Sequence, residues 1–202
     1  MIKNVVFDMG NVLARFDIYT HAARFTDDPD LQRLLVERVF RSVEWAQMDR
    51  GTLTVEEGAR KLEAAVPESI RSFAKRYVLE WYDHFTPMPG MEALVAELKQ
   101  AGYGIYLLSN AAENVYAYVP KLPVFSYFDG KFFSADYGVL KPSPQIYQKF
   151  LEVFSLRAEE CFFIDDMNSN IEGAIHEGFM GFVYRFDTEE LRQALQNAGV
   201  SV

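Results

Sequence analysis

The fold is decided by residues 4–13, which read Asn-Val-Val-Phe-Asp-Met-Gly-Asn-Val-Leu. Residues 5–7 form a short apolar run with β-branched side chains, which predicts a buried strand. Asp8 follows immediately, and Gly10 and Asn11 are residue types that favour a turn. We therefore expect Asp8 at the carboxyl end of a buried strand, the edge where open α/β sheets bind ligands. An unpaired carboxylate is costly in such a place, so Asp8 either caps the turn or belongs to a functional site.

Composition limits the partners that the chain can have. The 202 residues are 50% hydrophobic, which allows a large core without a metal or a disulfide. A net charge of -9 argues against binding to nucleic acid or to an anionic membrane, although a local cation can still hold a small phosphorylated ligand. The single cysteine, Cys161, lies in an apolar run and is expected to be a small buried residue rather than a nucleophile.

Targeting signals are not visible in the sequence. A strand pattern begins at the amino terminus without the features of a signal peptide, and no apolar run approaches the roughly 20 residues that span a membrane. We therefore expect a cytoplasmic protein. The sequence carries no signal for the oligomeric state.

Strand and helix patterns alternate from residue 88 onward. Strands are expected at 104–108, 131–133, 161–164 and 182–184. Helices are expected between Gly90 and Gly102, and at 112–121, 143–154, 169–178 and 188–198. This alternation predicts an α/β protein with a Rossmann-like, mostly parallel sheet flanked by helices. We assign residues 1–16 and 87–202 to this catalytic core.

Residues 17–86 interrupt the alternation. They hold no convincing strand, and Thr54 with Glu57 fits a capping box at the start of a helix. Aromatic and aliphatic residues recur here at helical spacing, as expected for a helical core. We predict about four helices, inserted directly after the first strand as a cap that covers its carboxyl end.

Chemically useful side chains follow four of the predicted strands. They are Asp8, Ser109 and Asn110, Asp165 and Asp166, and, a few residues after its strand, Lys141. Parallel strands bring these positions to one edge of the sheet. Each residue alone is compatible with a solvated turn, but several on one edge, with two adjacent acids, are hard to explain as caps.

The acids and the lysine suggest a metal and phosphate site. Asp8 and Asp166 could bind Mg²⁺, with the backbone carbonyl of Gly10 as a further oxygen ligand. The alternative for the pair Asp165 and Asp166 is a solvated turn in which one acid caps the next helix. Lys141 could neutralise both a phosphoryl group and Asp8, and its alternative is a solvated loop lysine.

The chemistry that these groups fit is phosphoryl transfer. Ser109 and Asn110 could donate hydrogen bonds to phosphoryl oxygens, or simply form a turn. Catalysis of phosphoryl transfer consists mainly of positioning and electrostatic stabilisation. A carboxylate such as Asp8 can act as the nucleophile and form an aspartyl-phosphate, which water then cleaves.

These residues resemble the four ordered motifs of the haloacid dehalogenase superfamily, and the resemblance covers essentially the whole chain. The motifs are Asp8 after its apolar strand, Leu108-Ser109-Asn110, Lys141-Pro142 and Phe163-Ile164-Asp165-Asp166. The helical insert resembles the cap domain of that family. Asp-Met-Gly-Asn-Val at 8–12 and the stretch 44–51 resemble the glucose-1-phosphate phosphatase branch.

The resemblance implies a role for each motif residue. Asp8 would be the nucleophile, Ser109 the phosphate-binding hydroxyl, and Lys141 the cation that holds the phosphoryl group and the nucleophile. Asp166 would be a direct Mg²⁺ ligand, and Asp165 a second acid at or near the metal.

One position departs from the family pattern. Most phosphatases of the family carry a second aspartate, the general acid/base, two residues after the nucleophile, and this chain has Gly10 there. The glucose-1-phosphate phosphatase branch shares the glycine, which could also serve a backbone conformation that only glycine adopts easily. Asp17 is a candidate proton donor, with a hinge or helix cap as its alternative role. Trp45 and Gln47 are candidate substrate contacts.

The sequence thus predicts a Mg²⁺-dependent phosphatase of small phosphorylated metabolites, with sugar phosphates among the candidates, acting through an aspartyl-phosphate on Asp8. One alternative is a haloacid dehalogenase, which also uses an aspartate nucleophile but needs no Mg²⁺. The adjacent acids Asp165 and Asp166 favour phosphate chemistry over that alternative. Another alternative is a non-catalytic protein that binds phosphorylated ligands on the same fold.

Overall fold

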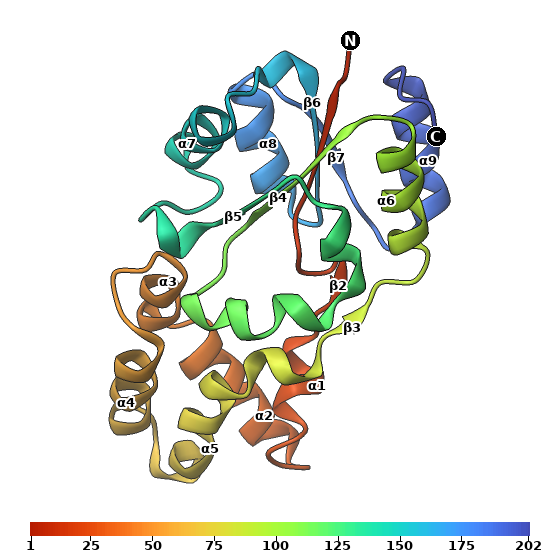
Figure 1. The fold of residues 1–202 in the computed structure, drawn as a ribbon. Coiled ribbons are helices and arrows are strands. Elements are labelled where there is room, and N and C mark those ends of the chain that lie inside the picture. Colours follow the sequence, from red (N-terminus) through yellow and green to blue (C-terminus); the bar gives the residue numbers. More distant parts are fainter.

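The computed structural model describes residues 1–202, the side chain of His84 excepted. Its central layer is a five-stranded parallel sheet in the order β5-β4-β1-β6-β7 (Figure 1). The strands are β1 (Asn4–Phe7), β4 (Gly104–Ser109), β5 (Gly130–Phe133), β6 (Cys161–Asp165) and β7 (Met180–Val183). The predicted α/β class with a mostly parallel sheet is confirmed.

The central strand β1 positions the site. All four of its residues are buried, as its apolar run predicted. Phe7 pairs with Leu107 on one side and with Ile164 on the other. Asp8 lies one residue further on, between the ends of β4 and β6. β4 and β5 follow β1 on one side of it, and β6 and β7 lie on its other side. The direction of the strand order therefore changes between β1 and β6, and open α/β sheets bind ligands at such a switch point.

Helices cover both faces of the sheet (Figure 1). They are α6 (Met91–Gln100) and α9 (Thr188–Asn197) on one face, and α7 (Pro144–Phe154) and α8 (Asn168–His176) on the other. Side chains of β1 alternate between the two faces: Val5 and Phe7 join one hydrophobic core, and Val6 joins the other. Cys161 is buried in the second core, as expected for a small apolar residue.

A helical insert follows β1 and lies below the carboxyl edge of the sheet (Figure 1). Its α-helices are α1 (Ile18–Ala22), α2 (Pro29–Leu35), α3 (Val43–Asp49), α4 (Val55–Ala65) and α5 (Glu68–Leu79), with a π-helical turn at Val36–Phe40 and a 3₁₀ turn at Trp81–His84. One half of the predicted capping box is present, because the Thr54 hydroxyl accepts the Glu57 N–H at 3.3 Å. The Glu57 carboxylate accepts from the Thr54 hydroxyl at 3.1 Å rather than from its N–H. The insert has five α-helices rather than about four, because α1 has five residues and is too short to show a helical repeat.

Two very short strands join the insert to the sheet layer. β2 (Ala14–Arg15) and β3 (Thr86–Pro87) pair antiparallel, so the chain enters and leaves the insert side by side. Sequence patterns do not predict this ribbon, since two residues are too few to show the alternation of a strand.

Two elements of the core differ from their expected form. The predicted helix at 112–121 consists of the 3₁₀ turns Glu113–Ala117 and Val119–Lys121, because Pro120 has no N–H to continue a helix. β7 begins two residues earlier than expected, at Met180, whose exposed side chain lies on an edge strand and carries no burial signal. Further 3₁₀ turns span Pro123–Tyr127, Ser134–Asp136 and Ala158–Glu160.

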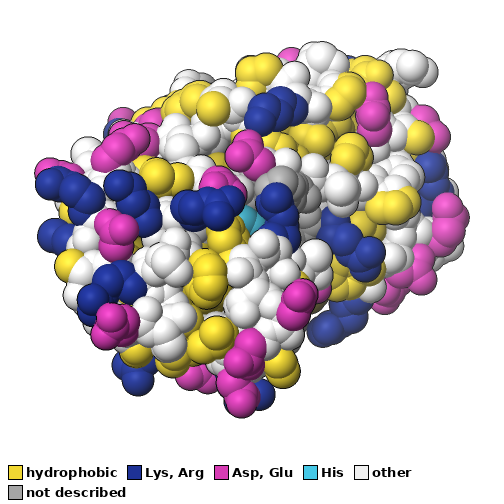
Figure 2. Space-filling view, turned by 90° about the horizontal axis from the view of Figure 1, so that it is seen from below, with side chains coloured by type: hydrophobic (Ala, Val, Ile, Leu, Met, Phe, Trp, Pro, Cys, Tyr) yellow, Lys and Arg dark blue, Asp and Glu magenta, His cyan; other side chains and the backbone are white. Residues whose placement is uncertain are grey.

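The outer face of the insert carries both signs of charge. Figure 2 shows basic and acidic side chains interspersed on this face, with hydrophobic side chains scattered among them. Such mixing gives no broad positive field of the kind that attracts nucleic acid. Among the described residues, no helix has the length and apolarity needed to cross a membrane.

Candidate active site

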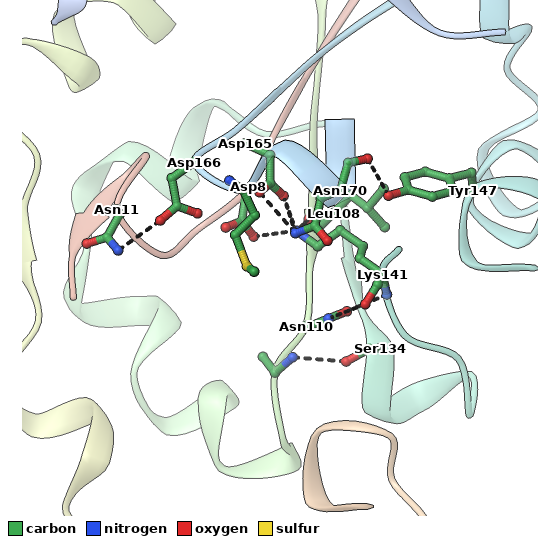
Figure 3. A network of polar contacts seen from close by, with 12 residues as sticks. Asp8, Asn11, Leu108, Asn110, Ser134, Lys141, Tyr147, Asp165, Asp166 and Asn170 are labelled. Carbon is green, nitrogen blue, oxygen red and sulfur yellow. Dashed lines mark hydrogen bonds and ion pairs between the residues drawn. The ribbon is translucent and has the colours of Figure 1, made fainter. Parts of the chain in front are cut away.

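Asp8 lies at the end of β1, inside a network of polar contacts (Figure 3). Its backbone N–H donates to the carbonyl of Ile164 at 2.9 Å, and its Oδ1 lies 2.8 Å from Lys141 Nζ. Burial raises the pKa of Asp8 to about 7, although Lys141 opposes the shift. The alternative role of Asp8, a cap of the turn, does not account for this buried ion pair.

Lys141 is the cation of the network. Its side chain is only 2% exposed, and Nζ donates to Asp8, to Asp165 Oδ2 at 2.6 Å and to the Leu108 carbonyl at 3.0 Å. Burial lowers the pKa of Lys141, but the two carboxylates outweigh it and hold the pKa above its usual value. Lys141 is therefore a fixed positive charge, and its alternative as a solvated loop lysine is wrong.

The two adjacent acids face different surroundings. Asp165 is fully buried, and its oxygens accept from Lys141, from the Asn170 amide at 3.0 Å and from the Met167 N–H at 2.9 Å. Asp166 is half-buried and borders the cavity above Asp8. The network therefore uses Asp165 to anchor Lys141, while Asp166 is open to a ligand.

Asn11 supports Asp166 from the turn after β1. Its amide donates to Asp166 Oδ2 at 3.0 Å (Figure 3). Its Oδ1 accepts the Phe16 N–H at 3.0 Å. Its backbone has a φ of 56°, a left-handed conformation that asparagine tolerates better than most residues. Burial raises the pKa of Asp166, and the negative charge of Asp165 adds to this rise.

The carboxylates fit a hard divalent cation. Asp8, Asp165 and Asp166 each offer an oxygen, and these oxygens all lie within 4.8 Å of one another. Mg²⁺ prefers such oxygen ligands and is commonly held by one or two carboxylates plus a substrate phosphate. Of the three acids, Asp8 and Asp166 line the cavity, as does Gly10, the predicted source of a carbonyl ligand.

The end of β4 forms the other side of the site. Ser109 is buried and lines the cavity. The Asn110 amide donates to the Lys141 carbonyl at 3.1 Å, and its oxygen accepts the Lys141 N–H at 2.9 Å. The Asn110 side chain therefore holds the lysine loop in place. Asn110 also lines the cavity, and its contact with phosphate stays a prediction.

A cavity of about 230 Å³ opens above these groups. Its base is polar, and its walls are aromatic side chains from the insert and its connections. The aromatic residues are Phe16, Phe40, Trp45, Trp81, Tyr82 and Phe85. Trp81 is central among them, with its ring centroid 4.5 Å from that of Phe16 and 4.8 Å from that of Trp45. Trp45 lines the cavity, and its role as a substrate contact stays a prediction.

Two other candidates lie elsewhere. Gln47 is exposed and lies outside the residues that line this cavity, because it faces away on the solvent side of α3. Asp17 caps α1, and its carboxylate accepts the N–H groups of Tyr19 and Thr20, both at 2.9 Å. The structure thus gives Asp17 the role of a helix cap, the alternative that the sequence allowed.

Gly10 does not need to be glycine for backbone reasons. Its φ lies outside the left-handed region, and a Cβ built on it would meet only Phe16, at 3.8 Å. The suggestion that this position requires a glycine-only conformation is wrong, so the missing second aspartate is a chemical rather than a steric feature.

Asp49 also borders the cavity, and sequence reasoning missed it. It is the last residue of α3, and it lies close to the Trp45 side chain and the Ala112 backbone, which favour its ionised form. Burial raises the pKa of Asp49 to about 7. The only hint in the sequence is its place within the stretch 44–51, because nothing in its spacing relates it to Asp8.

Comparisons with known proteins agree with this geometry. A sesquiterpene phosphatase of Aspergillus oryzae is 27% identical over 89% of this chain and 88% of its own length. A D-ribitol-5-phosphate phosphatase of Bacteroides thetaiotaomicron is 23% identical over 90% of this chain and 91% of its own length. A crystal structure of a haloacid dehalogenase family enzyme from the same bacterium, in complex with magnesium and inorganic phosphate, is 21% identical. It superimposes with a TM-score of 0.74 over 95% of this chain and 99% of that one, which shows a shared fold.

The family itself follows from a model of haloacid dehalogenase-like hydrolases, which matches residues 2–178. This span includes all four motifs and the whole insert. The predicted superfamily is therefore confirmed, and the chain belongs to the haloacid dehalogenase-like hydrolases.

Proposed function

We propose that this hydrolase is a Mg²⁺-dependent phosphatase that cleaves small phosphate monoesters through an aspartyl-phosphate on Asp8. The observation that carries the proposal is the buried Lys141, which bridges Asp8 and Asp165 beneath the cavity. In this proposal residues 1–16 and 87–202 form the catalytic core. Residues 17–86 form a cap that shields the site from bulk water and contacts the substrate.

The nucleophile and its cation act together. One Asp8 oxygen attacks phosphorus, while Lys141 favours the ionised form of Asp8 and attracts the phosphoryl oxygens. The Ser109 hydroxyl, at the end of β4, donates a hydrogen bond to the transferred group. When bound, Mg²⁺ would be held by Asp8, Asp166 and the Gly10 carbonyl, and it would neutralise negative charge on the phosphoryl group.

Phosphate chemistry is favoured over dehalogenation by the cavity-facing Asp166. Removal of a halide from a haloacid calls for no metal, and a carboxylate beside the nucleophile would then only repel the acid substrate. The phosphatases among the relatives support the same choice. The intact bridge between Lys141 and Asp8 also argues against a protein that only binds its ligand.

The cavity indicates the kind of substrate. Its volume of about 230 Å³ lies below the common range of roughly 300–1,000 Å³ for ligand pockets, which favours a small molecule. Aromatic walls favour a leaving group with at least one apolar face, such as the C–H face of a sugar ring or an isoprenoid chain. The resemblance to the glucose-1-phosphate phosphatase branch stays a prediction within this class.

A substrate screen tests the proposal. The purified protein is assayed on sugar, polyol, flavin and isoprenoid monophosphates with Mg²⁺ and with EDTA, and on a haloacid for halide release. We expect phosphate release that EDTA abolishes. Halide release that persists in EDTA would identify a dehalogenase. Binding of vanadate or another phosphate analogue without turnover of any ester would identify a binding protein.

Substitution of the adjacent acids should give two different defects. Asp166→Asn is expected to raise the Mg²⁺ concentration for half-maximal activity by at least tenfold, because it removes a cavity-facing ligand. Asp165→Asn is expected to change that concentration little and to lower the melting temperature, because it weakens the buried anchor of Lys141. Magnesium titrations and thermal melts of both variants check this. The reverse pattern would show that Asp165 is the ligand.

A further inference from the structure

Cleavage of a phosphate ester needs a proton for the leaving oxygen, and Gly10 cannot provide it. The described titratable residues that line the cavity are Asp8, Asp49, Tyr82, Lys141 and Asp166. In the proposed function Asp8 is the nucleophile, Asp166 a metal ligand and Lys141 a fixed cation. Burial raises the pKa of Tyr82 well above its usual value, which makes it a poor acid near neutral pH. Asp49 is the remaining group.

Asp49 is held firmly against the core. The Ser134 hydroxyl donates to the Asp49 carbonyl at 2.5 Å, and this serine begins the 3₁₀ turn that follows β5. Two residues later, Gly51 has a φ of +75° and passes so close to Ala135 that a Cβ would lie 2.1 Å from its carbonyl oxygen. The end of α3 therefore docks on the carboxyl edge of the sheet, and its backbone is fixed there.

The Asp49 side chain reaches the loop that carries the phosphate-binding groups. Its carboxylate lies close to the backbone of Ala112, three residues after Ser109, and to the side chain of Trp45, and both favour its ionised form. Tyr82 borders the same cavity, and its burial and the charge of Asp49 both raise its pKa. Asp8, Lys141 and Asp166 border the same cavity from the sheet. The carboxyl thus shares one small space with the proposed nucleophile.

We propose that Asp49 is the general acid/base of this enzyme, supplied by the helical insert in place of the aspartate that is absent at Gly10. This assignment rests on the proposed phosphatase function. Burial raises the pKa of Asp49 to about 7, so a large share of the group carries its proton near neutral pH and can donate it.

The two steps balance through this one carboxyl group. When Asp8 attacks phosphorus, the bond from phosphorus to the ester oxygen breaks and its electron pair stays on that oxygen. The Asp49 carboxyl gives this oxygen its proton, and the alcohol leaves. The Asp49 carboxylate then takes a proton from the water that attacks the aspartyl-phosphate. Inorganic phosphate departs, and the electron pair of the broken bond returns to Asp8.

The test is the dependence of rate on the leaving group. Asp49→Asn keeps the size of the side chain, but its amide has no proton of suitable acidity. kcat/KM for alkyl phosphates should fall about 10²–10⁴-fold, the usual contribution of a general acid. kcat/KM for dinitrophenyl phosphate should change less than threefold, because this leaving group needs no proton. In the wild type, activity on alkyl phosphates should fall as pH rises through about 7, and the variant should lose this limb.

Two control variants separate catalysis from docking. Ser134→Ala removes the hydrogen bond to the Asp49 backbone and should lower the rates of all esters by the same factor. Asp17→Asn changes an aspartate that caps α1 outside this cavity and should leave the leaving-group dependence unaltered. An Asp49→Asn variant that slows every ester equally would overturn the proposal and leave Asp49 as a docking residue. A steeper dependence in Asp17→Asn would instead identify Asp17 as the donor.

A rescue experiment gives an independent result. Gly10 has space for a side chain, so an aspartate at this position could replace the missing acid. The double variant Gly10→Asp, Asp49→Asn should have a kcat/KM for alkyl phosphates at least tenfold higher than that of Asp49→Asn alone. NMR of isotope-labelled aspartate carboxyls should also show a signal, absent from Asp49→Asn, that titrates near pH 7. Titration near pH 4 together with a failed rescue would contradict the proposal. If the wild type hydrolyses no phosphate ester at all, the proposed function fails, and this outcome is distinct from each of the others.

Discussion

Asp8→Asn should abolish turnover and leave the fold intact. An amide cannot attack phosphorus to give a stable acyl phosphate, so we expect kcat to fall by at least 10⁴-fold. The change is nearly isosteric, and Lys141 keeps its ion pair with Asp165 at 2.6 Å. Steady-state phosphate release from the purified variant is the measurement. Turnover within tenfold of the wild type would eliminate the covalent mechanism.

The stability of Asp8→Asn should depend less on pH than the stability of the wild type. Burial raises the pKa of Asp8 to about 7 in the folded protein, from the 3.8 of a free aspartate. The folded state therefore holds this proton more tightly than the unfolded state, and stability falls as pH rises from about 4 to about 7. Asparagine removes that loss. Melting temperatures at pH 5 and pH 8 should differ less in Asp8→Asn than in the wild type.

Lys141→Ala should be nearly as damaging, for an electrostatic reason. The substitution leaves Asp8 and Asp165 facing each other without their shared cation, and phosphate would enter a purely negative site. We expect kcat/KM to fall by at least 10²–10³-fold, the effect of losing a fixed charge contact in a transition state. Loss of one partner from a buried ion pair also costs about 3–5 kcal/mol of stability.

Lys149→Ala is the matched control for this lysine. Lys149 is partly exposed on α7 and pairs with Glu152 at the surface, where such pairs contribute about 0–1 kcal/mol. Its loss should change neither kcat/KM nor the melting temperature appreciably. An unchanged kcat/KM in Lys141→Ala, measured beside this control, would contradict the role assigned to Lys141.

Residues at strand ends could be predicted because the parallel sheet brings them together by a simple rule. An apolar run that ends in a polar side chain predicted Asp8 at the carboxyl end of β1. The same pattern predicted Ser109 and Asp165 at the ends of the neighbouring strands β4 and β6. The sequence could not predict that Asp165 binds Lys141 while Asp166 borders the cavity. This difference depends on which carboxylate the buried Lys141 reaches, and a sequence does not show that.

The position of Asp49 at the cavity could not be predicted from the sequence for a different reason. Asp49 comes to the cavity through the docking of α3 on the Ser134–Asp136 turn, a contact between segments 85 residues apart in the chain. Neither periodicity nor strand-end rules describe such a contact. The pairing of β2 with β3 escaped prediction similarly, because each strand has only two residues.

The central claim is that a phosphoryl group resides on Asp8 during each turnover. The direct measurement is a rapid acid quench of the enzyme with radiolabelled substrate and Mg²⁺, followed by mapping of the labelled peptide. We predict a transient phosphoryl group on the peptide that contains Asp8, cleaved by hydroxylamine and absent from Asp8→Asn. Phosphate release within the same turnover, with no label on the protein at any time point, would contradict the account.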